Sequence, residues 1–572
     1  MSSGNGLHPV APSEFPPPVD PAGEFVGPPT DAEDDRIEVG VAIVGGGQAG
    51  LACAIRLLQL LEDDPELTES LGEVPVAVIE KGRVAGAHQL SGGVMNPSAI
   101  RDLFPGDDSW PSFGEVGKET VYWMLNGKRA LPLKPTPPPF RNHGNFVVSV
   151  AELTRWLGEK AEEAGAYILS ETVGAKLLVE EGTVVGVRTG DKGRDKSGGE
   201  KSNFEPGSDV MARATVLAEG CWGHLTGAAL KELGLAAKDP QVWALGVKEV
   251  WEVPRPLDRV IHTLGWPLRY GAKYKEFGGS WIYPMNREGE PDRVSIGFVV
   301  GLDYADARLS VHDVLQEFKH HKLVRRILGD GKRVAWGAKA IPEGGYWAMP
   351  RLHAPGMVIA GDAAGMVNVP KLKGIHYAIR SGMFAAETLY RQLKAGSRDF
   401  SAYEQAVHDS EIGKDLYESR NMKQPFAKGF FLGGAITNAM VVSKGRLPGG
   451  HWPTHRDADQ ELLLTDRHER YPKPDGKYTF DKLSGVFTTG NATRDDAPSH
   501  IRIQQRVPRA VGEAWEWMCP AGVYEVPDDA PENGYVDLVV NPSNCVQCGA
   551  ITAKGGRLTP PEGGDGPVYQ VT

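Results

Sequence analysis

A glycine-rich turn near the N-terminus constrains the fold of this chain more than any other feature. Residues 39–44 are an apolar run rich in β-branched side chains, the segment GGGQAG follows at 45–50, and a stretch rich in Leu, Ala and Ile comes next. This order predicts a buried parallel strand, a tight turn and a helix, as in the first unit of a dinucleotide-binding sheet. Gly45 would permit the turn, Gly47 would let the backbone approach a pyrophosphate, and Gly50 would let the helix pack on the strand.

An acidic residue ends the next predicted strand. The segment VPVAVIEKG places Glu80 where such folds carry the carboxylate that binds the ribose hydroxyls. Its separation from the glycines exceeds the usual ~20 residues, because the segment LEDDPELTESLGEV lengthens the helix and the loop. We interpret that segment as a surface insertion. The alternative is that Glu80 is an ordinary exposed charge after a strand.

Both FAD and NAD use this kind of turn, so a second feature has to distinguish them. Residues 357–360 are a short predicted strand, Gly361-Asp362 follows, and a glycine-studded turn leads into a helix. The arrangement resembles the late Gly-Asp motif of glutathione-reductase-like and hydroxylase-like flavoproteins, whose carboxylate binds the ribityl chain. A helix N-terminus near the flavin pyrimidine would stabilise the anionic reduced ring. Asp362 could instead be a helix cap.

The source of electrons for such a flavin is expected to lie outside this chain. No second G-x-G-x-x-G motif follows a predicted strand between residues 100 and 340. A pyridine-nucleotide domain of the disulfide-reductase type is therefore not predicted.

Length, charge and cysteine content narrow the class further. A chain of 572 residues is long enough for two or three domains. The net charge of −12, without any Lys/Arg-rich run, argues against a nucleic-acid partner. The five cysteines are too few and too unevenly spaced for a disulfide framework, which predicts a reducing compartment.

Two features of the sequence indicate where in the cell the protein is expected. Residues 1–35 are rich in Pro, Gly and acidic side chains, which predicts a disordered tail without the features of a secretory signal or a mitochondrial presequence. No apolar run reaches 18 residues, so no membrane-spanning helix is predicted. The apolar stretch Phe430–Val442, followed by Lys444 and Arg446, could lie in a membrane interface or could be a buried core helix.

Longer segments resemble the electron transfer flavoprotein–ubiquinone oxidoreductase family, and they occur in one order from about residue 39 to residue 569. Gapped motifs spread over so much of a chain are specific, so the chain is identified as a member of that family. The segments are EKGRVAGAHQLSGGVMNP, VLAEGCWGHL, HTLGWPL, VVGLDY, GKRVAWGAKAIPEGGY, NVPKLKGIH, YPKPDGK, LSGVFTTGNATRDDAPSHIRI, CPAGVYEV, NCVQC and PPEGGDGPVY.

The resemblance implies bound FAD, a [4Fe–4S] cluster and a position on one leaflet of an energy-conserving membrane. It implies no catalytic nucleophile or acid–base dyad. It assigns the ADP half of FAD to Gly45, Gly47, Gly50 and Glu80, the isoalloxazine or pyrophosphate to Ser91, Gly92 and Gly93, the ribityl-pyrophosphate to Gly361 and Asp362, and the side of the flavin ring to the loop from Gly365 to Gly374.

A quinone needs an apolar slot that opens to the bilayer. The resemblance implies that two regions line it, Trp123–Phe140 and Phe430–Val442. His262, Gly265 and Trp266 are plausible neighbours of the flavin or the quinone, although His262 could equally be a core histidine.

The predicted cluster site lacks one ligand. The family holds its cluster with one cysteine in a CPAGVYE segment and three in a C-x-x-C-x-x-C run, which correspond here to Cys519, Cys545 and Cys548, with Ile551 in the fourth position. Four thiolates are the usual set for [4Fe–4S]. A [3Fe–4S] cluster, a labile [4Fe–4S] cluster, no cluster and incidental thiols all remain open. Zinc is less attractive, because no histidine lies in the tail to close the site.

We therefore expect an α/β fold with a glutathione-reductase-like or hydroxylase-like FAD-binding domain, an interleaved α+β quinone-binding region and a C-terminal ferredoxin-like domain. The expected boundaries are 36–100, 145–225 and 330–395 for the FAD-binding domain, 100–145 and 226–330 for the quinone-binding, membrane-facing region, 396–464 for a helical segment with the interfacial stretch, and 465–572 for the iron–sulfur domain.

The expected function is electron transfer from reduced electron transfer flavoprotein to ubiquinone or menaquinone, by a peripheral protein on the cytoplasmic face of a bacterial cytoplasmic membrane. FAD would reduce the quinone directly, and the tail site, if metallated, would be a relay. Two alternatives remain. One is an FAD-dependent monooxygenase or prenyl reductase that uses NAD(P)H, and the other is a flavin-loaded docking protein without turnover.

Overall fold

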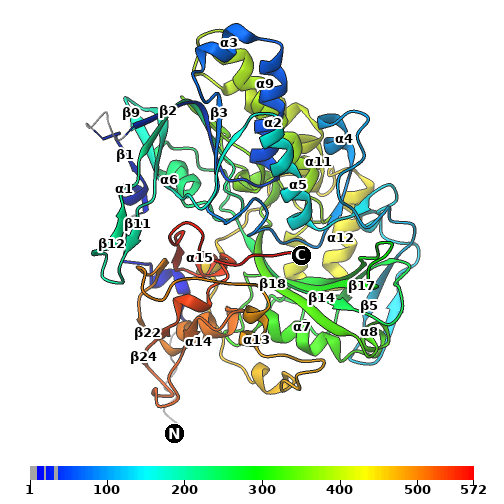
Figure 1. Ribbon diagram of the computed structural model, residues 1–572. Coiled ribbons are helices and arrows are strands. Elements are labelled where there is room, and N and C mark those ends of the chain that lie inside the picture. The colour runs from blue at the N-terminus through cyan, green and yellow to red at the C-terminus, as the bar shows by residue number, and fades with distance from the viewer. Residues whose placement is uncertain (1–8, 19–20, 31–35) are drawn as a thin grey trace.

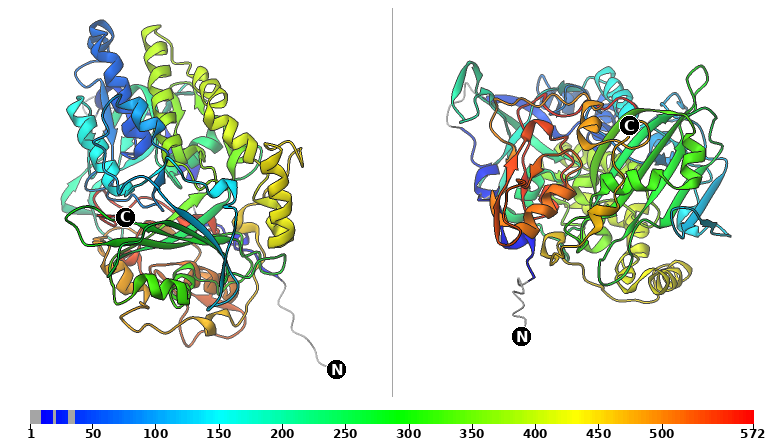
Figure 2. Two further views of the ribbon diagram at one scale, coloured as in Figure 1. Left: turned by 90° about the vertical axis from the view of Figure 1, so that its right-hand side faces the viewer. Right: turned by 90° about the horizontal axis from the view of Figure 1, so that it is seen from below.

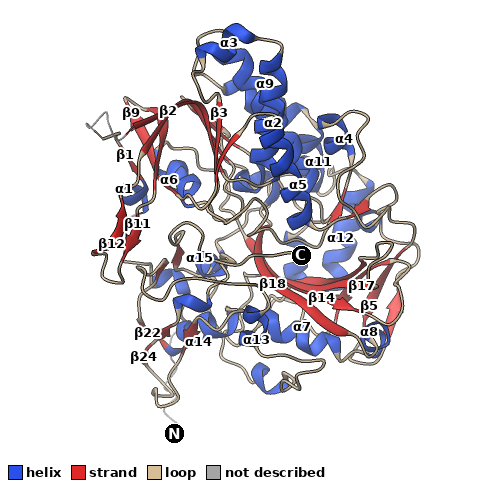
Figure 3. Cartoon of the chain, viewed as in Figure 1, coloured by secondary structure: helices blue, strands red, loops and turns tan. Residues whose placement is uncertain are grey.

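The computed structural model describes residues 9–18, 21–30 and 36–572. Two sheets and a C-terminal region of short elements lie around a common centre (Figure 1). Figure 3 shows most helices of the first sheet to its right and those of the second sheet below it. The segments that form the first sheet are far apart in the sequence, because the chain leaves it for the second sheet and returns.

The first sheet has nine strands and a parallel centre. β2 pairs in parallel with β3 and β13, β3 with β8, and β13 with β20. The last six residues of β2 are buried, as expected for a parallel strand that is covered on both faces. Its strands are β1 (Val26–Gly27), β2 (Arg36–Val44), β3 (Val76–Ile79), β8 (Tyr167–Leu169), β9 (Gly174–Glu180), β10 (Thr183–Thr189), β13 (Asp209–Leu217), β19 (His353–Ala354) and β20 (Met357–Ile359).

Two long helices pack closely beside this sheet. α2 follows the glycine turn and α9 follows the late Gly-Asp segment, and they touch where a Cβ on Gly382 would lie 2.2 Å from the Ala49 carbonyl oxygen. The two predicted motifs therefore belong to one packing unit. The helices of this part are α2 (Gln48–Glu62), α3 (Pro65–Ser70), α4 (Ser98–Leu103), α5 (Val150–Glu163), α6 (His224–Glu232), α9 (Ile375–Lys394), α10 (Ser401–Asp409) and α11 (Glu411–Ser419).

The second sheet has seven strands in the order β18-β14-β17-β16-β15-β5-β6, and only the β5–β15 pair is parallel. Residues 332–342 were expected in the FAD-binding domain, but they form β18 of this sheet. The elements are β5 (Glu119–Met124), β6 (Ala130–Pro132), β14 (Trp243–Glu252), β15 (Val260–Gly265), β16 (Gly278–Pro284), β17 (Arg293–Gly301), β18 (Lys332–Pro342), α7 (Val311–Lys319) and α8 (Lys322–Leu328).

The C-terminal region consists of short strands and helices, drawn in orange and red in Figure 1. It shares one apolar core with the second sheet, in which Trp515 and Val507 pack with the residues of β14 and β17. Its elements are α13 (Lys482–Phe487), β21 (Ile501–Arg502), β22 (Arg506–Pro508), α14 (Arg509–Met518), β23 (Tyr524–Glu525), β24 (Tyr535–Asp537), β25 (Val539–Val540), α15 (Ala550–Ala553) and β26 (Arg557–Leu558).

The prediction that residues 1–35 form a disordered tail is wrong for the part of that segment that the structure describes. A short helix α1 (Pro21–Phe25) leads into β1, which pairs with β9. Phe25 is buried, and its ring centroid lies 4.9 Å from that of His224. The segment cannot bury enough apolar surface to fold by itself, but Phe25 packs against the rest of the folded chain. The rest of the predicted tail lies outside the described residues.

Two small antiparallel strand pairs and one helix lie outside these groups. β11 (Lys192–Arg194) and β12 (Glu200–Glu205) form a hairpin, and β4 (Val94–Met95) pairs with β7 (Phe146–Val147). α12 (Phe430–Val442) lies at the outer edge of the molecule beside the second sheet (Figure 2, left). Among the described residues, no helix has the length and apolar character needed to cross a membrane.

Candidate functional site

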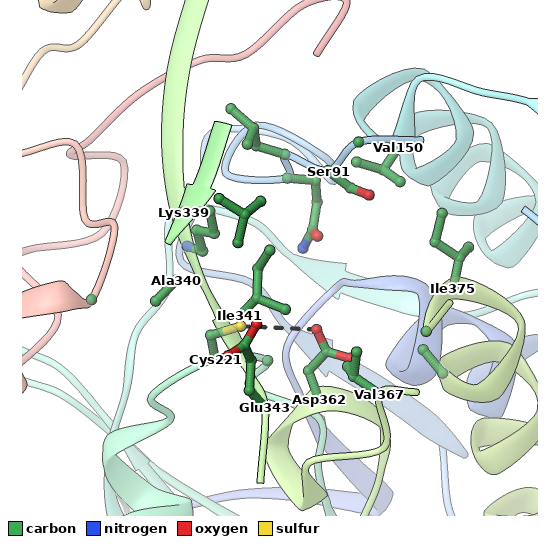
Figure 4. Close-up of a pocket in the computed structure, with 18 of the residues that line it drawn as sticks. Ser91, Val150, Cys221, Lys339, Ala340, Ile341, Glu343, Asp362, Val367 and Ile375 are labelled. Atoms are coloured by element: carbon green, nitrogen blue, oxygen red, sulfur yellow. Dashed lines mark hydrogen bonds between the residues drawn. The ribbon is translucent and has the colours of Figure 1, made fainter. Parts of the chain in front are cut away.

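A cavity of about 450 Å³ lies between the two sheets, and Figure 4 shows part of its wall. The residues at or just beyond the carboxyl ends of four parallel strands border it, namely Val44, Ile79, Ala218 and Ala360. This is the edge at which open α/β sheets bind ligands. The predicted site residues that line it are Gly45, Gly47, Glu80, Ser91, Gly92, Gly93, Asp362 and Gly374. Gly50, Gly361 and Gly365 lie behind this wall, in the turns that shape it.

The glycine turn needs glycine for steric reasons. Gly45 has φ +109°, and a Cβ there would lie 2.3 Å from the Ala218 carbonyl oxygen. A Cβ on Gly50 would lie 2.0 Å from the carbonyl oxygen of Gly45. Gly47 is the residue before α2, so the helix begins at the cavity with its free N–H groups and positive dipole end. This arrangement fits a pyrophosphate.

Glu80 is buried and is bound to the turn. Its Oε2 accepts a hydrogen bond of 2.8 Å from the Gly46 N–H, and its Oε1 accepts one of 2.6 Å from the Gly82 N–H. Only 8% of the residue is exposed, so it is not an ordinary surface charge. Carboxylate oxygens have further lone pairs, which leaves acceptor capacity for a ribose hydroxyl.

Asp362 points into the cavity from a short 3-10 helix, Gly361–Ala364 (Figure 4). The helix that follows, α9, begins after Gly374, so Asp362 does not cap it. The Cys221 thiol donates to the Asp362 carboxylate at 3.8 Å. Desolvation by the surrounding protein raises the pKa of Asp362 to about 6. Cys221 was not predicted as a site residue, and a single cysteine in a loop gives no signal that could have revealed it.

The Ser91–Gly93 turn is held by a lysine that sequence reasoning missed. Lys248, in β14, is 1% exposed and donates a hydrogen bond of 2.9 Å to the Ser91 carbonyl oxygen. The Ser91 hydroxyl in turn accepts one of 3.2 Å from the Gly93 N–H. Burial lowers the pKa of Lys248 to about 7. A charged residue inside the apolar run WALGVKEVW was the available signal.

The other end of the cavity is aromatic. The two regions predicted to line an apolar slot meet here, because Phe430 stacks on Trp123 with ring centroids 3.9 Å apart. Phe426 packs against Phe277 at 4.8 Å, and Phe140 lies 5.3 Å from His262. Leu264, Leu372 and Met422 complete this wall.

His262 is a buried histidine with a local partner. Its Nε2 lies 2.7 Å from the Tyr283 hydroxyl. Burial lowers the pKa of His262 to about 3, so the ring is neutral at physiological pH. Gly265 and Trp266 follow it in and after β15, but neither lines the cavity.

A charged pair in the cavity wall was not predicted either. Lys423 Nζ lies 2.8 Å from Glu343 Oε2 and 3.8 Å from Asp303 Oδ1. The partners are brought together only by the tertiary fold, since they come from the ends of β17 and β18 and from the segment before α12.

The three cysteines of the predicted cluster site lie in adjacent loops, outside the cavity wall. The Cys519 sulfur accepts a hydrogen bond of 3.4 Å from the Val523 N–H, and the Cys545 sulfur accepts one of 3.4 Å from the Gln547 N–H. The Cys548 carbonyl accepts a hydrogen bond of 2.8 Å from the N–H of Ala340, a cavity residue of β18. In the described chain, no group of three or more His, Cys, Asp or Glu side chains is arranged to hold a metal ion.

A comparison with solved structures supports the class that the sheet and cavity define. A geranylgeranyl bacteriochlorophyll reductase-like protein from Thermoplasma acidophilum matches with a TM-score of 0.53 and 17% identity, over 76% of this chain and 95% of that one. This likeness concerns the fold alone. The fold and the glycine-lined cavity define an FAD-binding α/β oxidoreductase.

Sequence relatives give the family. The proteins named "Electron transfer flavoprotein-ubiquinone oxidoreductase, mitochondrial" from Caenorhabditis elegans and Arabidopsis thaliana are 36% and 38% identical to this chain. The matches cover 93% and 95% of this chain, and 91% and 86% of those proteins. The chain therefore belongs to the electron transfer flavoprotein–ubiquinone oxidoreductase family, which confirms the prediction.

Two family models match separate parts of the chain. The one described as "ETF-QO, ubiquinone-binding" matches residues 243–341, which span β14 to β18. The one described as "Electron transfer flavoprotein-ubiquinone oxidoreductase, 4Fe-4S" matches residues 476–570, which include the three cysteines and Ile551.

Proposed function

We propose that this chain transfers electrons from reduced electron transfer flavoprotein through FAD to ubiquinone or menaquinone. The observation that carries the proposal is the continuity of one cavity, which joins the glycine turn and Asp362 to an aromatic end at Phe430. A flavin ring in its middle would be reachable for a quinone from the apolar end. The names of the relatives supply the two partners.

The residues at the end of the cavity that holds the glycine turn and Asp362 fit FAD. The N-terminus of α2 would bind the pyrophosphate, and Glu80 would accept hydrogen bonds from the ribose of the ADP half. Asp362 would hold the ribityl chain, and the Ser91–Gly93 turn, fixed by Lys248, would border the ring. When bound, FAD supplies the one- and two-electron chemistry that links a one-electron donor to a two-electron acceptor.

The aromatic end would bind the quinone ring by stacking and burial. Phe277, Phe426 and Phe430 line this end, and aromatic rings bury a large apolar area in stacked or edge-to-face arrangements. The neutral His262 and Tyr283 lie at the junction of the two ends. Two charged groups of this part of the wall already have partners: Lys423 Nζ lies 2.8 Å from Glu343 Oε2, and Lys373 Nζ donates a hydrogen bond of 2.7 Å to the Asn142 side chain.

We further propose a peripheral position on the cytoplasmic face of a bacterial cytoplasmic membrane. Phe431 is 78% exposed and Val442 is 86% exposed on α12, which ends next to Lys444 and Arg446. Exposed aromatic and aliphatic side chains beside basic residues favour binding to an anionic lipid surface. Phe430 of α12 itself lines the cavity, so the apolar end would open near the lipid.

A stopped-flow experiment tests the electron route. The purified FAD-loaded protein is mixed anaerobically with reduced electron transfer flavoprotein and then with a soluble quinone analogue. We expect the flavin to bleach with the carrier and to be reoxidised by the quinone. Rapid bleaching by NADPH alone would identify a monooxygenase or prenyl reductase instead. If the carrier cannot reduce the flavin, the chain would instead be a flavin-loaded docking protein without turnover.

A further inference from the structure

We propose that the C-terminal region holds its iron–sulfur cluster through the three thiolates of Cys519, Cys545 and Cys548, as a [3Fe–4S] cluster. Ile551 occupies the position of the fourth ligand. The inference rests on the proposed function for the electron donor, but its test counts iron and sulfide and does not depend on turnover. It departs from the 4Fe-4S cluster that the description of the matching family model names.

Backbone N–H groups face two of the three cysteine sulfurs. The Cys519 and Cys545 sulfurs each accept a backbone N–H at 3.4 Å. Hydrogen bonds of this kind stabilise cluster-bound thiolates. The Cys548 backbone is fixed by the bond from Ala340. Tyr524, a buried neighbour of all three thiols, lies among them.

Two lysines add positive charge beside this loop. Lys81 Nζ donates to the Gln547 side chain at 2.7 Å, and Lys339 Nζ donates to the Gln547 carbonyl at 3.2 Å. Gln547 stands between the two cysteines of the C-x-x-C segment. Thiolates bound to a cluster carry net negative charge, which nearby ammonium groups compensate. The site therefore keeps the features expected of a cluster site at three of its corners.

An apolar side chain occupies the position of the fourth cluster ligand. Ile551 lies in α15, is 4% exposed and cannot ligate iron. A Cβ on Gly556 would lie 2.7 Å from both Ile551 Cγ1 and Ile503 Cγ2, so the two isoleucines close over that glycine. A water on a fourth iron needs room and two to four polar partners. This packing offers neither, and so it disfavours a labile [4Fe–4S] cluster with a bound water.

A single metal ion does not fit the same donors. Within the described chain, no three His, Cys, Asp or Glu side chains converge closely enough to hold one. A cluster places its ligands at separate corners, so thiols that do not converge on one point remain compatible with it. Cys221 does not provide the missing ligand, because its thiol is paired with Asp362 in the cavity.

The test is a metal count combined with electron paramagnetic resonance on the full-length, FAD-loaded protein, purified anaerobically. We expect three irons and four sulfides per chain, with a signal in the oxidised protein. Ile551→Cys should raise the count to four irons, with a signal that appears only on reduction. Ile551→Val, the matched control, should keep three irons, and Cys221→Ser should not change the count.

Several results would overturn the inference. Four irons in the unmodified protein, with a signal only on reduction, would show that another group closes the cluster. Absence of iron from anaerobically purified protein would show that three thiolates are not enough. FAD absorbance reports the folding of each variant, and Cys548→Ser, which should lose all iron, provides a second check if Ile551→Cys does not fold. If the protein contains three irons but does not reduce quinone, the proposed function would be wrong and the inference about the cluster would stand.

Discussion

The ring of Phe430 stacks on the indole of Trp123, with centroids 3.9 Å apart, and so joins α12 to the edge of the second sheet. Phe430 lines the aromatic end of the cavity, whereas Trp123 is not part of the cavity wall. The neighbouring ring, Phe431, has its centroid 5.8 Å from that of Trp123, but it is 78% exposed and does not line the cavity. The two consecutive phenylalanines therefore have different surroundings, which permits a matched experiment.

Phe430→Ala should raise the KM for a soluble quinone analogue about tenfold, because one aromatic stacking contact and its buried surface are worth roughly 1.4 kcal/mol. Phe431→Ala should leave that KM unchanged but weaken binding to anionic vesicles. Steady-state kinetics and vesicle sedimentation measure the two effects. Equal KM values for both variants would show that the quinone binds elsewhere.

Glu80→Gln should weaken FAD binding by about one to two orders of magnitude. The amide would replace one of the two acceptor oxygens with a donor that faces a backbone N–H, and an unsatisfied buried group costs about 1–3 kcal/mol. Equilibrium titration of the apoprotein with FAD measures the change. Glu69→Gln, at an exposed position of α3, is the control and should bind FAD normally.

Gly45→Ala should prevent FAD binding and lower the melting temperature strongly, because the new Cβ would overlap the Ala218 carbonyl. Gly72→Ala is the control, because it introduces backbone strain without a steric clash. Gly72 also has a positive φ, +90°, but nothing lies within 4 Å of the Cβ position, so only about 1–2 kcal/mol of strain is expected. Similar losses in both variants would contradict the steric account of the turn.

Lys248 should make the unfolding free energy depend on pH. Its pKa is about 7 in the folded chain but about 10.4 in an unfolded one. Between these values the unfolded state binds more protons, so stability should rise with pH, by up to about 1.4 kcal/mol per pH unit. Below pH 7 this contribution is constant.

Lys248→Met removes the titrating group and fills a similar volume. Urea unfolding of both proteins at pH 7 and pH 9 isolates the lysine, because the other titrating groups are common to both. We expect the unmodified protein to gain stability over the variant as the pH rises. Parallel pH profiles would show that the lysine stays charged in the folded state.

The parts of the site that were predictable from sequence are set by local geometry. A glycine turn between strand and helix has few conformations, so Gly45 and Glu80 could be placed together before the fold was known. The family resemblance predicted that the regions Trp123–Phe140 and Phe430–Val442 line one slot, but the contact between the rings of Trp123 and Phe430 was not predicted. Lys248 was not predicted, since its role depends on β14 passing behind a turn that is distant in the sequence.

The N-terminal segment shows what composition alone could not predict. Its composition indicates that it cannot form a core by itself, yet Phe25 is buried beside His224 in the folded chain. Composition describes what a segment can do alone, whereas docking depends on a surface that only the complete fold creates.

One backbone hydrogen bond, from Ala340 to the carbonyl of Cys548, attaches the cysteine loop to the strand that borders the flavin cavity. The two redox centres are thus not interchangeable modules. A graft that exchanged the last hundred or so residues for those of a relative would have to match this strand edge as well as the thiols. Loss of flavin from such a chimaera, with its own cysteines intact, would be the first sign of a mismatch.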